Sequence, residues 1–534
     1  MATISQFLDR LQLGLQLVDA HEVEAVRSFW KQTARRIQKA NASLWRYHDL
    51  MLFVLAHPLN AEFERFAKSE LKRLQGILKA DPGSEALDKS GLYRTTLSLR
   101  FSWEMTRKLL EDKHCRICWH SVDEQAQDPG LLLKAFMPTA WKELCSSGLN
   151  LEDLLLALGV APQNRLNFLV GLLDIPQIDI AVRDAIWAGL GVYTTLEFTK
   201  VQFSRSYNQI PVKTMYSVNP LLKKFDHQQL LNTPLPAPDK LSSPQQSVYQ
   251  QVIQRALVLM ARETDPSTFM DLTTLRVYSL ERGIQIALFG MPPERQLPYV
   301  SYVGYMLFRN GYPLAYGGSW IWGGYAKFGL NIFEPYRGGE SGYILCQLLR
   351  VYKQAFTLNA IEIDAYQFGL DNPDGIRSGA YWFYYRYGFR SRLATLQRLA
   401  DREKKRMQEN PSYRSKESTL LQFTQSNMIW REGKLTIPED CATLVQRYVA
   451  RRYQGDVVNA GKEALNWAEE ALGFPKLTPK ERGVLQEFAL WLQASGQQQK
   501  LKHPAFSLLL RAKTKDPYQY NVLLSSWLYP SNDK

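Results

Sequence analysis

The hydrophobic period of the sequence changes near residue 270, and this change limits the fold more than any other feature. Before it, apolar residues recur every three or four positions, as Leu50, Phe53 and Val54 do, which is typical of amphipathic helices. After it, residues 273–290 and 299–319 are rich in Val, Ile and Tyr, as strands are. The chain therefore combines helical parts with a β-sheet.

The pair Asn310-Gly311 separates two of these extended runs and predicts a β-hairpin, because both residues tolerate the positive φ of a tight turn. Further elements follow in order: a strand at about 325–333, a helix at 341–356, a strand at 359–367 and a short aromatic helix at 376–389. This order predicts an α+β fold, a mixed β-sheet with helices on both faces.

At 534 residues the chain is too long for one ordinary core, and we expect several parts. The stretch 233-TPLPAPDKLSSP-244 carries four prolines and predicts a linker, or a surface strap between two bodies. The expected division is a helical N-terminal domain (1–232), a proline-rich linker (233–245), the mixed domain (246–395) and a helical C-terminal region (396–534). Within the last part, residues 400–418 are highly charged and predict an exposed helix and loop.

The formal net charge is +13, so the protein should attract anions. The N-terminal segment reads as an amphipathic helix without a basic leader, and the apolar segment 151–176 is interrupted at 162–165, before the roughly 20 residues that a membrane span needs. We therefore expect two buried helices at 151–176 and no membrane span. Five cysteines in so long a chain make no disulfide framework, which favours the cytoplasm.

A glycine-rich loop, 337-RGGESG-342, joins a short extended segment to the helix at 341–356. Glycines at 338, 339 and 342 let backbone amides turn toward one point, and the helix start adds partial positive charge, which together suit a phosphate group. The spacing is neither that of a Walker loop nor the G-x-G-x-x-G of a dinucleotide fold. A glycine-rich corner without a ligand is the alternative.

Two segments resemble the GNAT superfamily of acyl-CoA-dependent N-acyltransferases. The segment 332-IFEPYRGGESG-342 and the helix after it resemble motif A, and 379-GAYWFYYRYGF-389 is similar to the late helix of the family, with Tyr384, Gly388 and Phe389 at the matching positions. The strand at 359–367 stands where the family has its fifth strand, and the hairpin stands where it has strands two and three. The resemblance covers about residues 265–395.

The resemblance implies acyl-CoA as co-substrate, acetyl-CoA first of all, and no metal. Its diphosphate would lie on Arg337, Gly338, Gly339, Glu340, Ser341 and Gly342. Glu340 stands where the motif has glycine, so its carboxylate would repel the diphosphate unless the side chain points away. Backbone amides near 331–333 would polarise the acyl carbonyl.

The chemistry also needs a proton donor and a base. Tyr384 would protonate the departing thiolate by its family position, although packing is an alternative role in so aromatic a stretch. Glu334 is the first candidate base and Glu281 the second, and for both a solvated or salt-bridged carboxylate is the alternative.

The function expected from the resemblance is transfer of an acyl group from acyl-CoA to an amine, whose identity the sequence leaves open. The helical parts would shape the acceptor site or bind a protein partner. Two alternatives stand beside it: an interaction protein that keeps the fold without catalysis, and a transferase that uses aminoacyl-tRNA. Nucleic acid is not our expected partner, because no RNP, KH or helix-turn-helix signature occurs.

The stretch 114-HCRICWH-120 raises a zinc site as an alternative. A structural zinc site needs four ligands, and no second C-x-x-C pair occurs in the sequence. We expect instead that the stretch continues the helix before it and that Cys115 and Cys118 are core residues.

Overall fold

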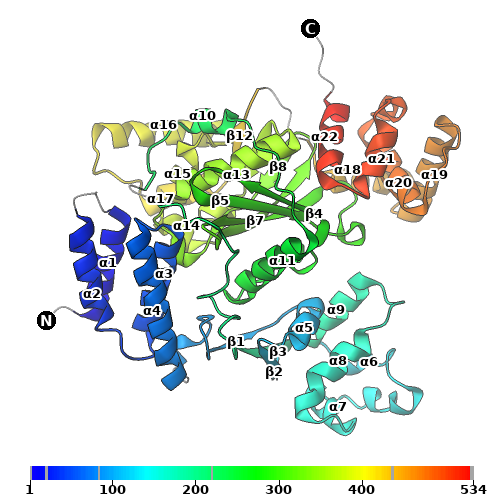
Figure 1. Cartoon of the computed structure of the whole chain (residues 1–534). Coiled ribbons are helices and arrows are strands. Elements are labelled where there is room, and N and C mark those ends of the chain that lie inside the picture. The colour runs from blue at the N-terminus through cyan, green and yellow to red at the C-terminus, as the bar shows by residue number, and fades with distance from the viewer. Residues whose placement is uncertain (1–2, 18–21, 82–84, 218–220, 434–437, 530–534) are drawn as a thin grey trace. The chain divides into compact units, whose positions relative to one another are not determined.

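The computed structural model describes residues 3–17, 22–81, 85–217, 221–433 and 438–529. By contacts the chain forms two compact units (Figure 1). Unit 1 comprises Met1–Leu221, Ser243–Phe269 and Arg309–Pro313, and unit 2 comprises Leu222–Ser242, Met270–Phe308 and Leu314–Lys534. The predicted division into an N-terminal domain, a mixed domain and a C-terminal region, with a linker at 233–245, stays a prediction.

Unit 1 begins with four helices, as the helical period predicts. These are α1 (Ile4–Leu17), α2 (Val23–Ala34), α3 (Ala42–Ala56) and α4 (Ala61–Ala80). Asn41 and Asn60 cap α3 and α4, since each side chain accepts hydrogen bonds from two amides of the first turn. Leu8, Leu11 and Leu15 are the buried stripe of α1, so the N-terminal amphipathic helix is confirmed.

Unit 1 also contains a three-stranded antiparallel sheet, so the expectation of an all-helical N-terminal region is wrong. Its strands are β1 (Thr96–Leu99), β2 (Arg116–Val122) and β3 (Val192–Glu197), in the order β1-β3-β2. Residues of β3 alternate between buried and half-buried, which is the period of two of a strand covered on one face. Strands of four to seven residues are too short for their alternating hydrophobic pattern to be recognised in a sequence that is otherwise helical.

Cys118 lies on β2, and the helix before it, α5 (Trp103–Glu111), ends before Cys115. The expected helical setting of 114–120 is therefore wrong. The register break between Trp119 and Ser121 shows a bulge at His120, which hides the strand alternation in the sequence.

The remaining helices of unit 1 pack on this sheet or precede the second unit. They are α6 (Pro129–Leu133), α7 (Leu151–Ala157), α8 (Arg165–Leu173), α9 (Ile180–Leu190), α11 (Ser243–Val258) and α12 (Asp265–Thr268). Leu154, Leu155, Leu169 and Leu173 are almost fully buried in one hydrophobic cluster with the sheet. The two buried helices predicted at 151–176 are confirmed as α7 and α8.

The sheet of unit 2 has nine strands and is mixed, as predicted. They are β4 (Asp271–Ser279), β5 (Ile284–Gly290), β6 (Ser301–Arg309), β7 (Tyr312–Trp322), β8 (Tyr325–Phe328), β9 (Asn331–Ile332), β10 (Ala360–Ile363), β11 (Arg390–Ser391) and β12 (Met428–Arg431). The order is β11-β12-β10-β8-β7-β6-β5-β4, and β9 lies off this path and pairs with β7. Strands β8 and β10 are parallel, whereas β12 is antiparallel to β10 and to β11.

The predicted hairpin is confirmed as β6 and β7. Its turn residues Asn310 and Gly311 have φ of 49° and 81°, the left-handed values that a two-residue hairpin requires. The tip belongs to unit 1, where the Ile210 amide donates to the Gly311 carbonyl at 2.8 Å and the Asn310 side chain donates to the Ala56 carbonyl at 3.1 Å.

Strand β12 lies beyond residue 395, so the expectation of an all-helical C-terminal region is also wrong. Its four residues pair with β10 in the register Ala360↔Arg431 to Ile363↔Met428. The strand covers an edge of β10 that would otherwise expose its backbone groups. Four residues are too few to show a period, and the charged segment before them reads as helix.

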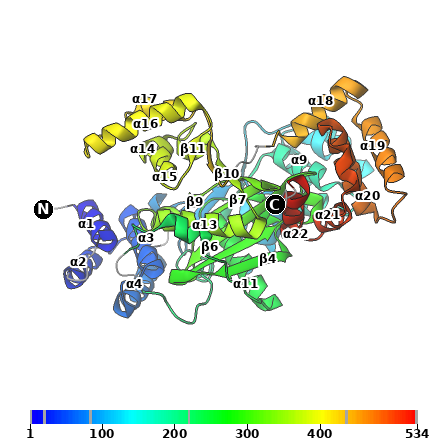
Figure 2. The ribbon, with the colours of Figure 1, turned by 90° about the horizontal axis from the view of Figure 1, so that it is seen from above.

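The helices of unit 2 fall into two groups. The first is α10 (His227–Asn232), α13 (Ser341–Phe356), α14 (Pro373–Arg377), α15 (Ala380–Arg386), α16 (Ala394–Glu409) and α17 (Glu417–Phe423), and the second, the C-terminal bundle, is α18 (Cys441–Tyr453), α19 (Val457–Ala471), α20 (Pro479–Ser495), α21 (Phe506–Lys513) and α22 (Pro517–Leu528). Helix α13 crosses one face of the sheet, and α14 to α17 gather beside β11 (Figure 2). The predicted helix at 341–356 and the exposed charged helix after 395 are confirmed as α13 and α16.

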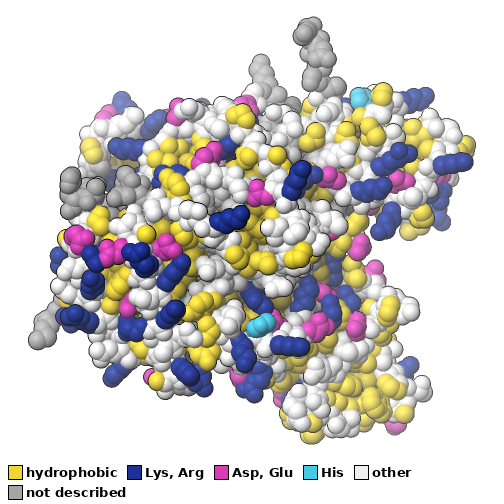
Figure 3. Space-filling model, viewed as in Figure 1, with side chains coloured by type: hydrophobic (Ala, Val, Ile, Leu, Met, Phe, Trp, Pro, Cys, Tyr) yellow, Lys and Arg dark blue, Asp and Glu magenta, His cyan; other side chains and the backbone are white. Residues whose placement is uncertain are grey.

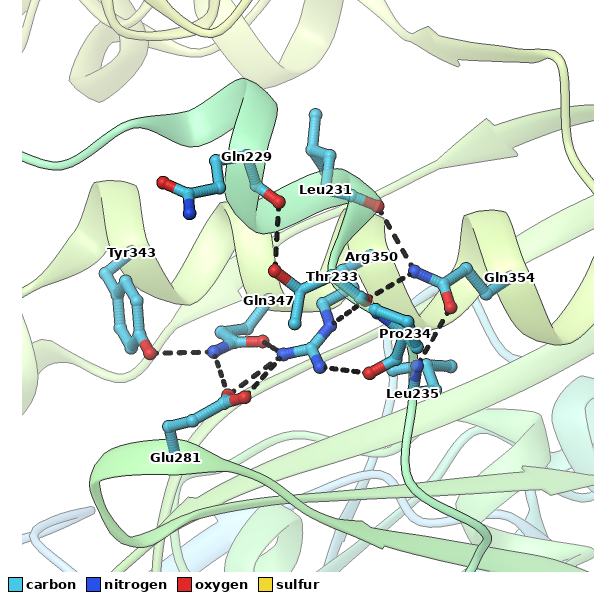
Figure 4. A network of polar contacts seen from close by, with 10 residues as sticks. All are labelled: Gln229, Leu231, Thr233, Pro234, Leu235, Glu281, Tyr343, Gln347, Arg350 and Gln354. Carbon is cyan, nitrogen blue, oxygen red and sulfur yellow. Dashed lines mark hydrogen bonds and ion pairs between the residues drawn. The ribbon is translucent and has the colours of Figure 1, made fainter.

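The proline-rich segment forms a surface strap on unit 2, which we call the proline strap (residues 233–242). Arg350 of α13 is almost fully buried and donates to the carbonyls of Thr233 at 2.8 Å and Pro234 at 2.6 Å (Figure 4). Farther along, the Asp239 amide donates to the Val277 carbonyl of β4 at 2.7 Å. Proline has no backbone N–H, so a proline-rich segment can form few backbone hydrogen bonds of its own. Here the buried Arg350 guanidinium supplies hydrogen bonds to two of its carbonyls.

Candidate functional site

The glycine loop links β9 to α13, as the sequence predicts. A single helical turn, Glu334–Tyr336, precedes it, and α13 begins at Ser341. Gly338 is exposed and has a φ of 81°, a conformation that other residues adopt only with strain. The first amides of α13 have no acceptor within the helix, and they carry the partial positive charge of its N-terminus.

The Glu340 side chain points into the protein, away from the open side of the loop. It is fully buried, and its carboxylate accepts a hydrogen bond from Arg282 Nη2 at 2.6 Å and from the Leu222 amide at 2.5 Å. The ion pair compensates the buried negative charge. The one acidic residue of the predicted cofactor loop is therefore neutralised within the protein and does not face a ligand on the loop.

One side of the loop is closed by the protein itself. A Cβ atom on Gly342 would collide with the hydroxyl of Tyr387, so these two residues are in direct contact. The Phe225 ring packs against Tyr343 and Tyr387, with ring centroids 5.4 and 6.0 Å away. Gly338 is exposed and Gly339 is partly exposed, and they are the side from which a ligand would approach.

Arg337 and Glu334 lie on the surface beside this open side. Their side chains form an ion pair at 3.3 Å, and both are about half exposed. Arg337 Nε also donates to the Ile332 carbonyl at 3.3 Å, which holds the guanidinium next to the loop. Water screens so exposed a pair, so the attraction between the two side chains adds little to stability.

The parallel strands β8 and β10 separate just before the loop. They pair from Ala360↔Tyr325 to Ile363↔Phe328, after which the chain turns away and β9 pairs with β7. Between β8 and β9 lie Gly329 and Leu330, which are not paired with β10. A split between parallel strands at their carboxyl ends forms a crevice, where α/β proteins commonly bind ligands.

Polar side chains gather at this split. Gln367 Oε1 accepts hydrogen bonds from the Leu330 amide at 3.2 Å and from the Tyr384 hydroxyl at 3.3 Å. The Tyr305 hydroxyl donates to the Gly329 carbonyl at 3.0 Å. The structure thus brings Tyr384 to the end of β8, and it brings the end of α15 to the start of α13 through Tyr387.

Tyr384 is buried, and burial raises the pKa of its hydroxyl well above the usual value. The hydroxyl therefore keeps its proton at neutral pH and can act as a hydrogen-bond donor or as an acid.

The predicted carbonyl-polarising amides near 331–333 are only partly available. The Phe333 amide donates to the Leu314 carbonyl at 2.9 Å within the sheet. The Leu330 amide, by contrast, is held by the Gln367 side chain, an acceptor that can rotate away. Leu330 is therefore a better-placed donor than Phe333 for a carbonyl at the split.

The Glu281 carboxylate is engaged by hydrogen bonds and is not a free base. Its carboxylate accepts hydrogen bonds from Gln347 Nε2 at 2.9 Å and Arg350 Nη1 at 2.9 Å (Figure 4). Burial alone would raise its pKa, but hydrogen bonds from its own backbone, Gln347 and Arg350 lower the pKa below the usual value. It stabilises the contact between α13 and the proline strap.

Gln367 and Tyr305 were not among the predicted site residues. Gln367 lies in the short helical turn Ala365–Phe368 that follows the buried strand β10, and polar residues after the carboxyl end of such a strand are a recognised signal of a ligand site. Tyr305 gives no comparable signal, because it is one aromatic residue among many in a buried strand.

Among the described residues, no group of three or more His, Cys, Asp and Glu side chains is arranged to hold a metal ion. All five cysteines are free thiols, and burial raises the pKa of Cys115 to about 12, which disfavours the thiolate that zinc binds. No helix in the part of the chain that the structure describes is long and apolar enough to cross a bilayer.

Basic side chains are scattered over the face in Figure 3, with acidic ones between them, and they form no single block there. Comparison with known proteins identifies no relative of this chain, since no protein-family model, curated protein or solved structure matches it. Its own geometry is therefore the basis for any functional conclusion.

Proposed function

We propose that unit 2 transfers an acyl group from acyl-CoA to an amine, with acetyl-CoA as the first donor to test. The observation that carries the proposal is the inward orientation of Glu340. It turns the one carboxylate within the loop away from the exposed Gly338 at the start of α13, close to the split between two parallel strands. The resemblance to GNAT acyltransferases supports the same reading.

In this proposal the diphosphate lies on the amides of the loop and the first turn of α13, with Arg337 beside it. The charge and the directed N–H groups both favour an anion there. The remainder of the donor follows the split, which places the thioester near Leu330. When the amine attacks, the Leu330 amide leaves Gln367 and donates to the carbonyl oxygen, where negative charge develops.

Proton transfer completes the reaction. The C–N bond forms and the C–S bond breaks, the amine loses one proton, and the departing thiolate gains one. Tyr384 suits the donor role because its hydroxyl lies at the split and keeps its proton at neutral pH. Glu334 remains the candidate base, acting directly or through water, since it is exposed beside the loop.

Release of free thiol from acetyl-CoA, with and without a panel of primary amines, tests the activity. The proposal predicts amine-dependent release by the full chain. Saturable CoA binding without turnover of any amine would favour a non-catalytic protein, and absence of CoA binding would remove the proposal.

A further inference from the structure

A pocket lies in the C-terminal bundle of unit 2, formed by α18, α19 and α20 with residues that precede β6. Its volume is about 710 Å³, which lies in the range usual for small-molecule sites. The apolar part of its lining includes Tyr299, Val445, Val449 and Leu490. The pocket is separate from the glycine loop in sequence and shares none of its residues.

Gly483 lines this pocket and is exposed. It lies inside α20, where glycine is less favourable than alanine, and a Cβ atom at this position would have no atom within 4 Å. Gly461 of α19, which also lines the pocket, differs, because a Cβ there would collide with Gln486. Packing explains Gly461 but not Gly483, whose missing side chain only leaves space.

Glu487 stands one turn after Gly483, on the same side of α20, and also lines the pocket. Among the described residues, none forms a hydrogen bond or ion pair with its carboxylate; Lys513 acts on it only at longer range. The Lys513 ammonium instead donates to the Leu297 carbonyl at 2.8 Å. Burial raises the pKa of Glu487, with the charge of Lys513 partly opposing this shift.

We propose that this pocket binds a small amphiphilic organic ammonium ion, with its apolar body against Val445, Val449 and Leu490 and its ammonium group on the Glu487 carboxylate. A half-buried carboxylate without an ion pair gains most from a cation. A carboxylate ligand would meet repulsion there, and a neutral ligand would leave Glu487 unpaired. The proposal is independent of the acyl transfer function.

The test is titration of the full chain with three probes of equal length: hexylammonium, hexanol and hexanoate. We expect hexylammonium to bind at least about tenfold more tightly than hexanol, and hexanoate not to bind. Methyl NMR signals of Val445 and Val449 should shift with hexylammonium. Equal affinity for hexylammonium and hexanol, no binding of hexylammonium at about 1 mM, or binding without shifts of these methyl signals would overturn the proposal.

Two variants test the same point, with a matched control. Glu487→Gln keeps the shape and should weaken hexylammonium about tenfold or more, while leaving hexanol unchanged. Gly483→Leu should fill the pocket and abolish binding of both. Glu470→Gln removes an exposed carboxylate of the neighbouring helix and should change nothing. Wild-type affinity in Glu487→Gln would contradict the assignment, and the three-probe comparison decides the matter even if a variant does not fold.

Discussion

Glu340 and Arg282 form the ion pair on which the orientation of the glycine loop depends. The carboxylate is fully buried and Arg282 is mostly buried, so replacing either residue removes an ion pair that lies largely out of water. The same pair explains how an acidic residue can stand in a loop proposed to bind an anion.

Glu340→Gln should lower the free energy of unfolding by about 1–3 kcal/mol, because the buried ion pair between residue 340 and Arg282 is lost. Urea unfolding measures this, with Glu409→Gln, an exposed carboxylate on α16, as the control that should change little. The double variant of Glu340 and Arg282 should lose less than the sum of the two single variants. Strict additivity would show that the two side chains do not depend on each other.

Tyr384→Phe removes only the hydroxyl that lies on Gln367. If Tyr384 protonates the leaving thiolate, kcat should fall on the order of 10²-fold, with thermal stability nearly unchanged. Since burial raises the pKa of Tyr384 above its usual value of 10.0, the wild-type rate should show no loss from its ionisation between pH 7 and 9. A variant with full activity would assign Tyr384 to packing alone.

At the scale of elements, α13 connects the candidate site of unit 2 with the proline strap. Its first turn carries the candidate site, and its middle holds the proline strap through the Arg350 network (Figure 4). The proline strap and the glycine loop are therefore held on the same helix. Loss of Arg350 should loosen the proline strap more than the glycine loop.

Arg350→Met should cost about 3 kcal/mol of unfolding free energy, because two carbonyls of the proline strap and the Glu281 carboxylate each lose a hydrogen bond from the buried guanidinium. Lys405→Met, an exposed cation of α16, is the control. Hydrogen exchange should quicken at the Leu235 and Asp239 amides, which bond to Gln354 and Val277. Unchanged exchange at both amides would mean that the strap is held by other contacts.

The elements that could be predicted are those whose signals are local. Asn310-Gly311 fixes the hairpin by its turn chemistry, and sixteen residues of α13 show a clear helical period. Strands β2 and β12 could not be predicted, because one carries a bulge and the other has four residues. The orientation of Glu340 depends on Arg282, 58 positions away in the sequence, and no local pattern contains it.

At the scale of the whole molecule, the net charge of +13 makes nucleic acid the main competing partner. Nonspecific binding to phosphates weakens steeply with salt, by about 10³-fold or more between 50 and 200 mM for six or more contacts. We expect any tRNA binding to follow this dependence and not to displace CoA. Competition between tRNA and CoA that persists at physiological salt would favour an aminoacyl-tRNA donor.

The most direct test of the account is calorimetric titration of CoA into three forms of the full chain: wild type, Gly338→Val and Gly76→Val. Gly338 has a φ of 81°, which valine can adopt only with strain, so valine there should change the loop backbone. A side chain at Gly76 of α4 would meet no atom within 4 Å. The account predicts saturable binding by wild type and Gly76→Val, and at least about tenfold weaker binding by Gly338→Val with unchanged circular dichroism. Absence of binding by the wild type, or equal affinity of Gly338→Val, would contradict it.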